Sequence, residues 1–239
     1  MAADSAAPAN PYRIVIATPH ARNDALVAAF DADPAYEVLR VRNKADLTPE
    51  AMKDFGAQWI FFPHWSWLIP EDVHRNFPSV IFHMTDVPYG RGGSPLQNLI
   101  ARGHQTTQLT ALRCEAGLDT GPVYLKRPLS LEGTAEEIFR RASAAMEPMI
   151  REIVTGGIDP LPQEGEVTTF QRRKPAQSAV DTVEGAPALY DLIRMLDADG
   201  YPHAFAETAN FRMIFRDARM ADGRVEARVI IEPRAGDET

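Results

Sequence analysis

The sequence predicts an α/β fold: a trimmed, mostly parallel Rossmann-like sheet with a small C-terminal α+β appendage. Short apolar runs typical of buried parallel strands recur through the first half of the chain. The connections between these runs are short and leave room only for small helices, so this half of the sheet looks trimmed. The expected strands here are Tyr12–Ala17, Tyr36–Val41, Trp59–Phe62 and Val80–Phe82, with helices at Asn23–Phe30 and Thr48–Phe55.

The second half continues this pattern and then changes. Apolar residues recur at helical spacing over Glu132–Val154, and Thr134 with Glu137 three residues later forms a capping-box signal. Strands are expected at Leu109–Cys114 and Val123–Pro128, and from residue 183 onward a helix at Ala186–Ala198 precedes strands at Ala204–Glu207, Phe211–Ala218 and Val225–Ile231. We therefore expect a disordered N-terminus at 1–11, a main domain at 12–178 and a C-terminal domain at 179–239.

Composition limits the function. A formal net charge of -8 argues against nucleic acid as the main partner, because phosphate binding needs clustered cations. The single cysteine, Cys114, excludes an intramolecular disulfide and a cysteine-rich metal site. No apolar stretch approaches the ~20 residues of a membrane span, and the first ten residues lack a basic and an apolar region. We expect a cytoplasmic protein without a membrane partner.

The turn after the first strand, from Thr18 to Asp24, contains no glycine. A G-x-G-x-x-G motif at this junction would cradle a pyrophosphate, and its absence argues against NAD or FAD.

The stretch from Ile81 to Pro122 carries the polar groups that suggest chemistry. His83 stands where an apolar strand stops, and Asp119 lies in a turn after the next strand. A carboxylate near an imidazole fixes its tautomer and raises its basicity, so the two could form a general-base pair. Alternatively, His83 is a hydrogen-bonded core histidine and Asp119 only starts a turn. Between them a glycine-rich loop leads to Ser94 and Pro95, the signature of a helix start.

The order of these parts resembles the 10-formyltetrahydrofolate-dependent formyltransferases, the family that includes methionyl-tRNA formyltransferase. Its pattern is H-x-[ST]-x-x-P-x-x-R-G-x-x-P, then a helix, a threonine-rich strand and D-T-G-P. The matching residues are His83, Thr85, Pro88, Arg91, Gly92, Pro95, Asp119, Thr120, Gly121 and Pro122. The resemblance implies a catalytic domain over 12–178, 10-formyltetrahydrofolate as formyl donor with tetrahydrofolate as product, and no metal.

The resemblance also implies the site residues. His83 would act as base on the acceptor amine, Asp119 would orient it and shuttle the proton, and Thr85 would assist. Cofactor-binding residues would be Trp67, Leu68, Ile69, Arg91, Gly92, Leu118 and Asp119, and substrate-binding residues Asp86, Tyr89, Gly93, Ser94 and Tyr201.

The loop after the third strand, residues 63–73, contains two tryptophans and a histidine. Flat aromatic rings beside free backbone groups suit a pterin, and in the resembled family the matching loop binds that ring through main-chain groups. The alternative is that Trp65 and Trp67 only cover the sheet edge.

One position departs from the family pattern. The family has an asparagine two residues before the histidine, read as a donor to the formyl oxygen, and this chain has Ile81 there. Losing one such donor costs roughly 100- to 1000-fold in rate. Either Thr85, Arg91 or a backbone N–H takes the role, or the protein is slow or inactive.

The acceptor is inferred from the C-terminal part. That region and the segment Phe170–Ser178 resemble the nucleotide-sugar N-formyltransferases, which implies an amino-sugar nucleotide as substrate and a homodimer. The basic run at 172–174 is either a solvated linker or a hinge near a phosphate-bearing substrate. Tyr201 either stacks on a base or packs within a turn. Alternatives are an N-hydroxyornithine-type formyltransferase of siderophore assembly and a folate-binding relative without catalysis.

Overall fold

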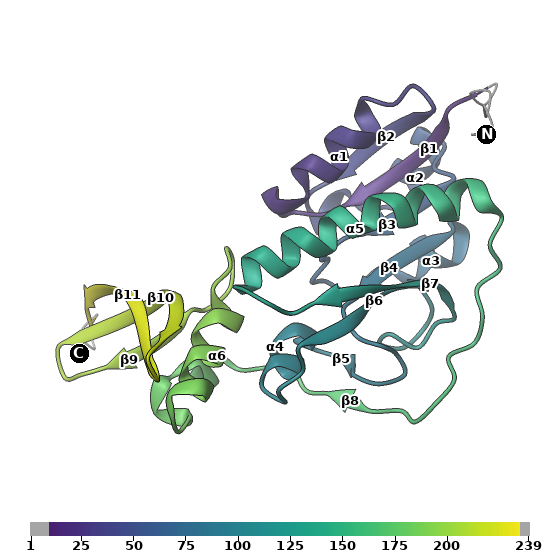
Figure 1. The fold of residues 1–239 in the computed structure, drawn as a ribbon. Coiled ribbons are helices and arrows are strands. Elements are labelled where there is room, and N and C mark those ends of the chain that lie inside the picture. The colour runs from purple at the N-terminus through teal and green to yellow at the C-terminus, as the bar shows by residue number, and fades with distance from the viewer. Residues whose placement is uncertain (1–9, 235–239) are drawn as a thin grey trace, which may run out of the picture. The chain divides into compact units, whose positions relative to one another are not determined.

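The computed structural model describes residues 10–234, so most of the N-terminus predicted to be disordered lies outside the described residues. Its main sheet has the strand order β2-β1-β3-β4-β6-β7 (Figure 1). The strands β2, β1, β3 and β4 are parallel to one another, and β6 runs antiparallel to β4. The mostly parallel α/β sheet is thus confirmed. Its strands are β1 (Tyr12–Ala17), β2 (Tyr36–Val41), β3 (Trp59–Phe62), β4 (Ser79–His83), β6 (Thr106–Arg113) and β7 (Val123–Ser130).

The helices begin where the sequence provides caps. The Thr48 hydroxyl accepts the N–H of Ala51 at the start of α2, and Gly56 ends that helix with φ 72°. At α5 the main-chain N–H of Thr134 donates to Glu137 Oε2 (2.7 Å) and the N–H of Glu137 donates to Thr134 Oγ1 (3.3 Å), which confirms the capping box. The helices are α1 (Asp24–Asp31), α2 (Pro49–Phe55), α3 (Glu71–Asn76), α4 (Pro95–Ile100), α5 (Ala135–Gly156) and α6 (Ala186–Leu196), with short 3-10 helices at Ala21–Asn23, Lys44–Asp46, Pro175–Ser178 and Val180–Thr182.

The main sheet is covered on both faces, as a parallel sheet requires. On one face, Met52 of α2 and Val73 of α3 pack into a buried apolar cluster with strand residues such as Phe62, and Ile81 of β4 packs against this cluster. On the other face lie α1 and α5, where Arg151 of α5 donates to the carbonyl of Ala29 in α1 (3.4 Å) and to Asp33 just after α1 (2.5 Å) (Figure 1). Because side chains alternate along a strand, His83 points to the same face of β4 as Ile81.

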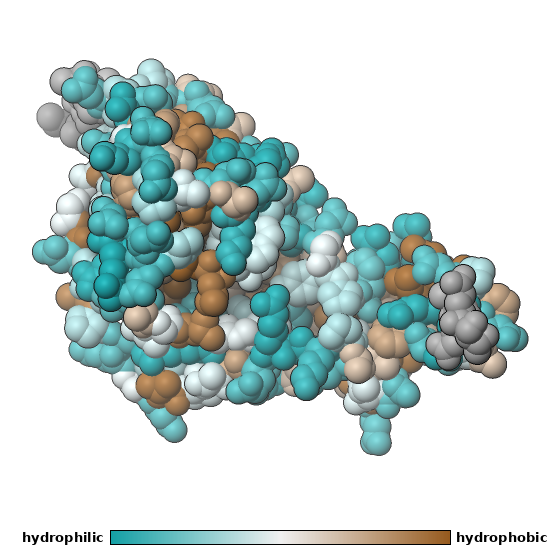
Figure 2. Space-filling view, turned by 180° about the vertical axis from the view of Figure 1, so that it is seen from behind, coloured by the Kyte–Doolittle hydropathy of each residue, from teal (hydrophilic) through white to brown (hydrophobic). Residues whose placement is uncertain are grey.

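The chain divides into two compact units that interleave in sequence. The first unit comprises residues 1–91, 108–129 and 140–168, and the second 92–107, 130–139 and 169–239. This division differs from the predicted boundary at residue 178, because α4 and the first turn of α5 belong to the second unit. On the face shown in Figure 2 the surface is mostly hydrophilic, with apolar residues in small groups.

The second unit contains the predicted small antiparallel sheet, in the order β11-β10-β9. Asp222 and Gly223, with φ 49° and 73°, form the two-residue turn between β10 and β11. A short pair of strands, β5 (Arg91–Gly92) and β8 (Thr169–Phe170), is not predicted, because two-residue strands have no periodicity to detect. The strands of the small sheet are β9 (Ala204–Glu207), β10 (Phe211–Ala221) and β11 (Arg224–Pro233).

Candidate active site

His83, the last residue of β4, is held from both sides of its ring. Its Nε2 lies 2.8 Å from the carbonyl oxygen of Gly90, which can only accept, so Nε2 carries a hydrogen. Its Nδ1 lies 3.4 Å from Asp119 Oδ2. The residue is buried, with 6% of its surface exposed. The Gly90 carbonyl therefore sets the tautomer, a task the sequence assigns to Asp119, and Nδ1 is the ring nitrogen that faces the carboxylate.

Asp119 reaches His83 from the turn after β6. Its backbone adopts the left-handed region at φ 55°, which costs a non-glycine residue about 1 kcal/mol or more. Its side chain is 15% exposed. The structure thus brings together the two side chains that the sequence predicts as a pair, 36 residues apart (119 minus 83). Their catalytic roles stay a prediction.

The Thr85 hydroxyl is hydrogen-bonded within the protein. The residue is fully buried, and Oγ1 donates to the same Gly90 carbonyl at 3.3 Å. Its own main-chain oxygen accepts from Thr110 Oγ1 at 2.7 Å. Thr85 thus joins the strand end to the loop that orients His83, and its predicted catalytic and donor roles stay a prediction.

Arg91 is engaged within the protein. Its Nε and Nη2 both donate to Gln163 Oε1, at 3.0 and 2.8 Å. Sequence reasoning missed Gln163, which lies in a proline-rich segment without periodicity 72 residues further along the chain. The predicted contact of Arg91 with a cofactor or formyl oxygen would have to compete with this pair.

Gly92 and Gly93 are explained by close packing inside the second unit. A Cβ on Gly92 would lie 2.6 Å from the Phe170 carbonyl oxygen, and one on Gly93 would lie 2.6–2.9 Å from atoms of Arg172. Ser94 occupies the N-cap position of α4 as predicted, but its hydroxyl accepts the N–H of Arg173 (3.1 Å) instead of capping the helix. The predicted contact of Gly92 with the cofactor, and those of Gly93 and Ser94 with the substrate, stay predictions.

Asp86, predicted to bind the substrate, is paired with Lys126 at 2.5 Å. Lys126 also donates to the carbonyl of Val87, 2.8 Å away. Tyr89 follows in the same loop, where its N–H donates to Asp86 O at 3.1 Å. The Asp86 carboxylate is thus neutralised by a cation.

The predicted pterin loop keeps surface and main-chain groups accessible. Trp67 is 43% and Leu68 74% exposed, whereas Ile69 packs against the apolar cluster. Trp65 meets Trp67 edge to face at 4.8 Å. The main-chain groups of Trp67, Leu68 and Ile69 make no hydrogen bond to another described residue. Leu118, beside Asp119, is also exposed.

Comparisons with known proteins agree with these features. A family model described as methionyl-tRNA formyltransferase, C-terminal domain, matches residues 175–232. A methionyl-tRNA formyltransferase structure from Clostridium thermocellum is 45% identical with a TM-score of 0.90, over 93% of this chain and 99% of that chain. This chain belongs to the methionyl-tRNA formyltransferase-like family.

This chain is also similar to two further formyltransferases. The methionyl-tRNA formyltransferase of Ruegeria pomeroyi is 30% identical over 199 residues, 78% of this chain, and this chain spans 65% of that relative's length. The formyltransferase PseJ from Anoxybacillus kamchatkensis, solved with UDP-4,6-dideoxy-4-formamido-L-AltNAc and tetrahydrofolate, shares the fold. Its TM-score is 0.57 at 17% identity, over 80% of this chain and 95% of that chain.

His64, directly after β3, gives this formyltransferase-family chain an expected pH dependence. Both ring nitrogens are buried, and burial, followed by the nearby cations Arg22 and His20, lowers the pKa of His64 to about 3. The folded pKa lies below the ordinary 6.5, so protons bind the unfolded chain first. The free energy of unfolding should therefore fall as the pH drops from about 6.5 toward 3, by about 2 kcal/mol at pH 5.

Urea unfolding at pH 7 and pH 5 checks this, with a His64→Asn variant as comparison. Asparagine tolerates the left-handed backbone that His64 adopts at φ 52° and does not titrate in this range. The variant should lose less stability than the native chain between the two pH values. An equal loss in both proteins would contradict the assignment.

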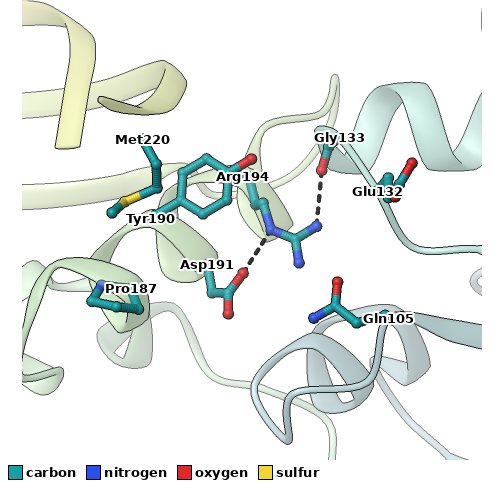
Figure 3. Close-up of a pocket in the computed structure, with 8 residues that line it drawn as sticks. All are labelled: Gln105, Glu132, Gly133, Pro187, Tyr190, Asp191, Arg194 and Met220. Atoms are coloured by element: carbon teal, nitrogen blue, oxygen red, sulfur yellow. Dashed lines mark hydrogen bonds and ion pairs between the residues drawn. The ribbon is translucent and has the colours of Figure 1, made fainter. Parts of the chain in front are cut away.

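The second unit contains a pocket of about 300 Å³ (Figure 3). Its buried cation, Arg194, donates to Asp191 Oδ1 (2.6 Å) and to the carbonyls of Leu131 and Gly133, so it ties α6 to the loop before α5. Tyr201, also in this unit, packs its ring on Phe139 at 5.6 Å. This contact is the packing alternative for Tyr201, and its predicted stacking on a base stays a prediction. The pocket is lined by Gln105, Glu132, Gly133, Pro187, Tyr190, Asp191, Arg194 and Met220.

Other groups add no chemistry to the family site. Cys114 follows β6 and is half-buried. Burial, and to a smaller extent the charges of Asp119 and Glu115, raise the pKa of its thiol to about 11. Within residues 10–234, no group of three or more His, Cys, Asp or Glu side chains could hold a metal ion. No helix in that range is long and apolar enough to cross a membrane.

Proposed function

We propose that this chain is an N-formyltransferase that moves a formyl group from 10-formyltetrahydrofolate to the amine of a small acceptor. The contact of His83 with Asp119, 3.4 Å between Nδ1 and Oδ2, carries the proposal. Both residues match the family motif, and the carboxyl end of a central strand is where α/β sheets collect their sites. No metal is needed for this reaction.

The loop after β3 fits the folate. The main-chain groups of residues 67–69 make no hydrogen bonds to other described residues, so they can bind a heterocycle. The exposed side chains of Trp67 and Leu68 offer apolar surface for its rings. When bound, 10-formyltetrahydrofolate supplies the formyl group and leaves as tetrahydrofolate.

The tautomer of His83 decides which nitrogen acts as base. Nε2 donates to Gly90, so Nδ1 is the atom that accepts the proton as the acceptor amine attacks the formyl carbon. The proton on Nδ1 then faces the Asp119 carboxylate, which stabilises the imidazolium. The carboxylate passes this proton on to the tetrahydrofolate nitrogen that leaves the formyl carbon. General-base catalysis of this kind supplies on the order of 100- to 10,000-fold in rate.

For the acceptor we propose an amino-sugar nucleotide. The net charge of -8 disfavours the phosphate backbone of a tRNA, and the fold is shared with a sugar-directed formyltransferase. Methionyl-tRNA is the second candidate, because the Clostridium thermocellum relative that bears that activity in its name is 45% identical.

Incubation with 10-formyltetrahydrofolate and a panel of amines tests both candidates. The panel contains amino-sugar nucleotides, N-hydroxyornithine and methionyl-tRNA, and tetrahydrofolate release above an acceptor-free control is measured. Release with a sugar nucleotide alone supports the proposal, and release with methionyl-tRNA alone replaces it by the second candidate. Folate binding without release on any amine would identify a relative without catalysis.

A substitution at Ile81 tests whether a missing oxyanion donor limits catalysis. Ile81 lies two residues before His83, on the same face of β4, and offers no hydrogen to the formyl oxygen. We expect Ile81→Asn to raise kcat, by up to the roughly 100- to 1000-fold that one oxyanion donor is worth. It should also cost about 1–3 kcal/mol in stability, because Ile81 packs against apolar residues. Steady-state kinetics check the rate, and an unchanged kcat would show that another donor already fills the role.

A further inference from the structure

We propose that Gln163 is a positioning residue of the formyl-transfer site: it holds the turn of Asp119 at the distance from His83 that proton transfer requires. This rests on the proposed function. Gln163 lies 44 residues after Asp119, in the extended segment that follows α5. It is joined by hydrogen bonds to both loops that form the site.

The amide nitrogen of Gln163 spans the Asp119 turn. Nε2 donates to the carbonyl oxygen of Asp119 at 2.8 Å and to that of Gly121 at 2.7 Å, so both of its hydrogens are used. The two carbonyls flank Thr120. A non-glycine residue in the left-handed region persists only where its surroundings hold it, and Asp119 is such a residue. The two bonds from Gln163 provide that hold.

The amide oxygen of Gln163 is fixed from the other side. Oε1 accepts from Nε and Nη2 of Arg91, which sets the orientation of the amide and leaves Nε2 to face the turn. Arg91 follows Gly90, whose carbonyl accepts from His83 Nε2. His83, Gly90, Arg91, Gln163 and Asp119 thus form a closed ring of contacts, completed by the 3.4 Å approach of Asp119 to His83.

The backbone around Gln163 is anchored on both sides. Leu161 pairs with Val123 through two main-chain hydrogen bonds of 2.7 and 2.9 Å. Thr168 donates to the carbonyl of Pro88 and accepts from the N–H groups of Gly90 and Arg91. The segment 161–168 therefore joins the loop after His83 to the strand after Asp119. A rigid support of this kind is what a proton-transfer pair needs, because a misplacement of about 1 Å can cost on the order of 100-fold in rate.

The Gln163→Glu variant isolates this role. Glutamate keeps the shape of the side chain and the oxygen that accepts from Arg91. In place of the amide nitrogen, however, a second oxygen faces the carbonyls of Asp119 and Gly121 and cannot donate to them. We expect kcat to fall about 10- to 100-fold while KM for 10-formyltetrahydrofolate changes by less than about threefold. The matched control is Glu164→Gln, a change at the neighbouring exposed residue, which should leave kcat unchanged.

A double-mutant cycle with Asp119→Asn separates positioning from general damage. If Gln163 acts through Asp119, Gln163→Glu should reduce kcat little further in the Asp119→Asn background. An additive loss would overturn the proposal.

Hydrogen exchange of the ligand-free protein tests the contact without turnover. Amides of residues 116–121 should exchange faster in Gln163→Glu than in the native chain and in Glu164→Gln. Unchanged exchange would overturn the role of Gln163 even in an active enzyme. A native chain without transferase activity would overturn the proposed function, whereas faster exchange in the variant would still support the hold of Gln163 on the turn.

Discussion

The His83→Ala variant is expected to lose formyl transfer, with kcat/KM reduced on the order of 100- to 10,000-fold. Nδ1 of the imidazole faces Asp119, and an alanine leaves the attacking amine without this base. Tetrahydrofolate affinity should stay roughly unchanged, because the loop proposed to bind the pterin lies after β3, not on β4. Steady-state kinetics and equilibrium titration with tetrahydrofolate measure the two quantities.

Two further variants keep this result interpretable. His83→Gln retains an N–H donor for the Gly90 carbonyl but has no base, so it should be nearly as inactive as alanine. His74→Ala changes a histidine of α3 and should leave kcat/KM at the native level. Activity close to native in both His83 variants would remove His83 as the base.

The second large effect is expected at Gly121. A Cβ built on this residue would lie 1.9 Å from the main-chain oxygen of Arg113, and a backbone atom cannot move aside as a flexible side chain can. Gly121→Ala must therefore displace the Asp119 turn. We expect a loss of about 3 kcal/mol in stability, which corresponds to about 6–12 °C in Tm, and a fall in kcat of roughly 100-fold. Thermal unfolding and steady-state kinetics measure both.

Gly156→Ala is the matched control for Gly121→Ala. Gly156 ends α5, and the nearest atom to its added Cβ would be Cγ1 of the Ile158 side chain, at 3.3 Å. Its Tm should differ from native by far less than that of Gly121→Ala. A Gly121→Ala protein with native Tm and native kcat would show that the turn adapts without consequence.

Local pattern was sufficient for most of the fold. The strands β1, β2 and β3 have the predicted bounds, and α2 begins at the cap that Thr48 provides. Such features depend on the alternation of a few neighbouring residues and on caps within one turn of helix, so they can be read locally. The antiparallel direction of β6 cannot be read locally, because the direction of a strand depends on how the chain returns to the sheet.

Motif and spacing were likewise sufficient to name His83 and Asp119 as a pair, and the sequence by itself determined the α/β class and this candidate site. Only the tertiary structure decided how the pair is held: the Gly90 carbonyl on Nε2, the buried hydroxyl of Thr85, and the amide of Gln163 across the Asp119 turn. The last of these contacts joins residues 44 positions apart, and the supporting pair of Arg91 and Gln163 lies 72 positions apart. No periodicity in the chain marks such partners, because they are chosen by where folded loops meet.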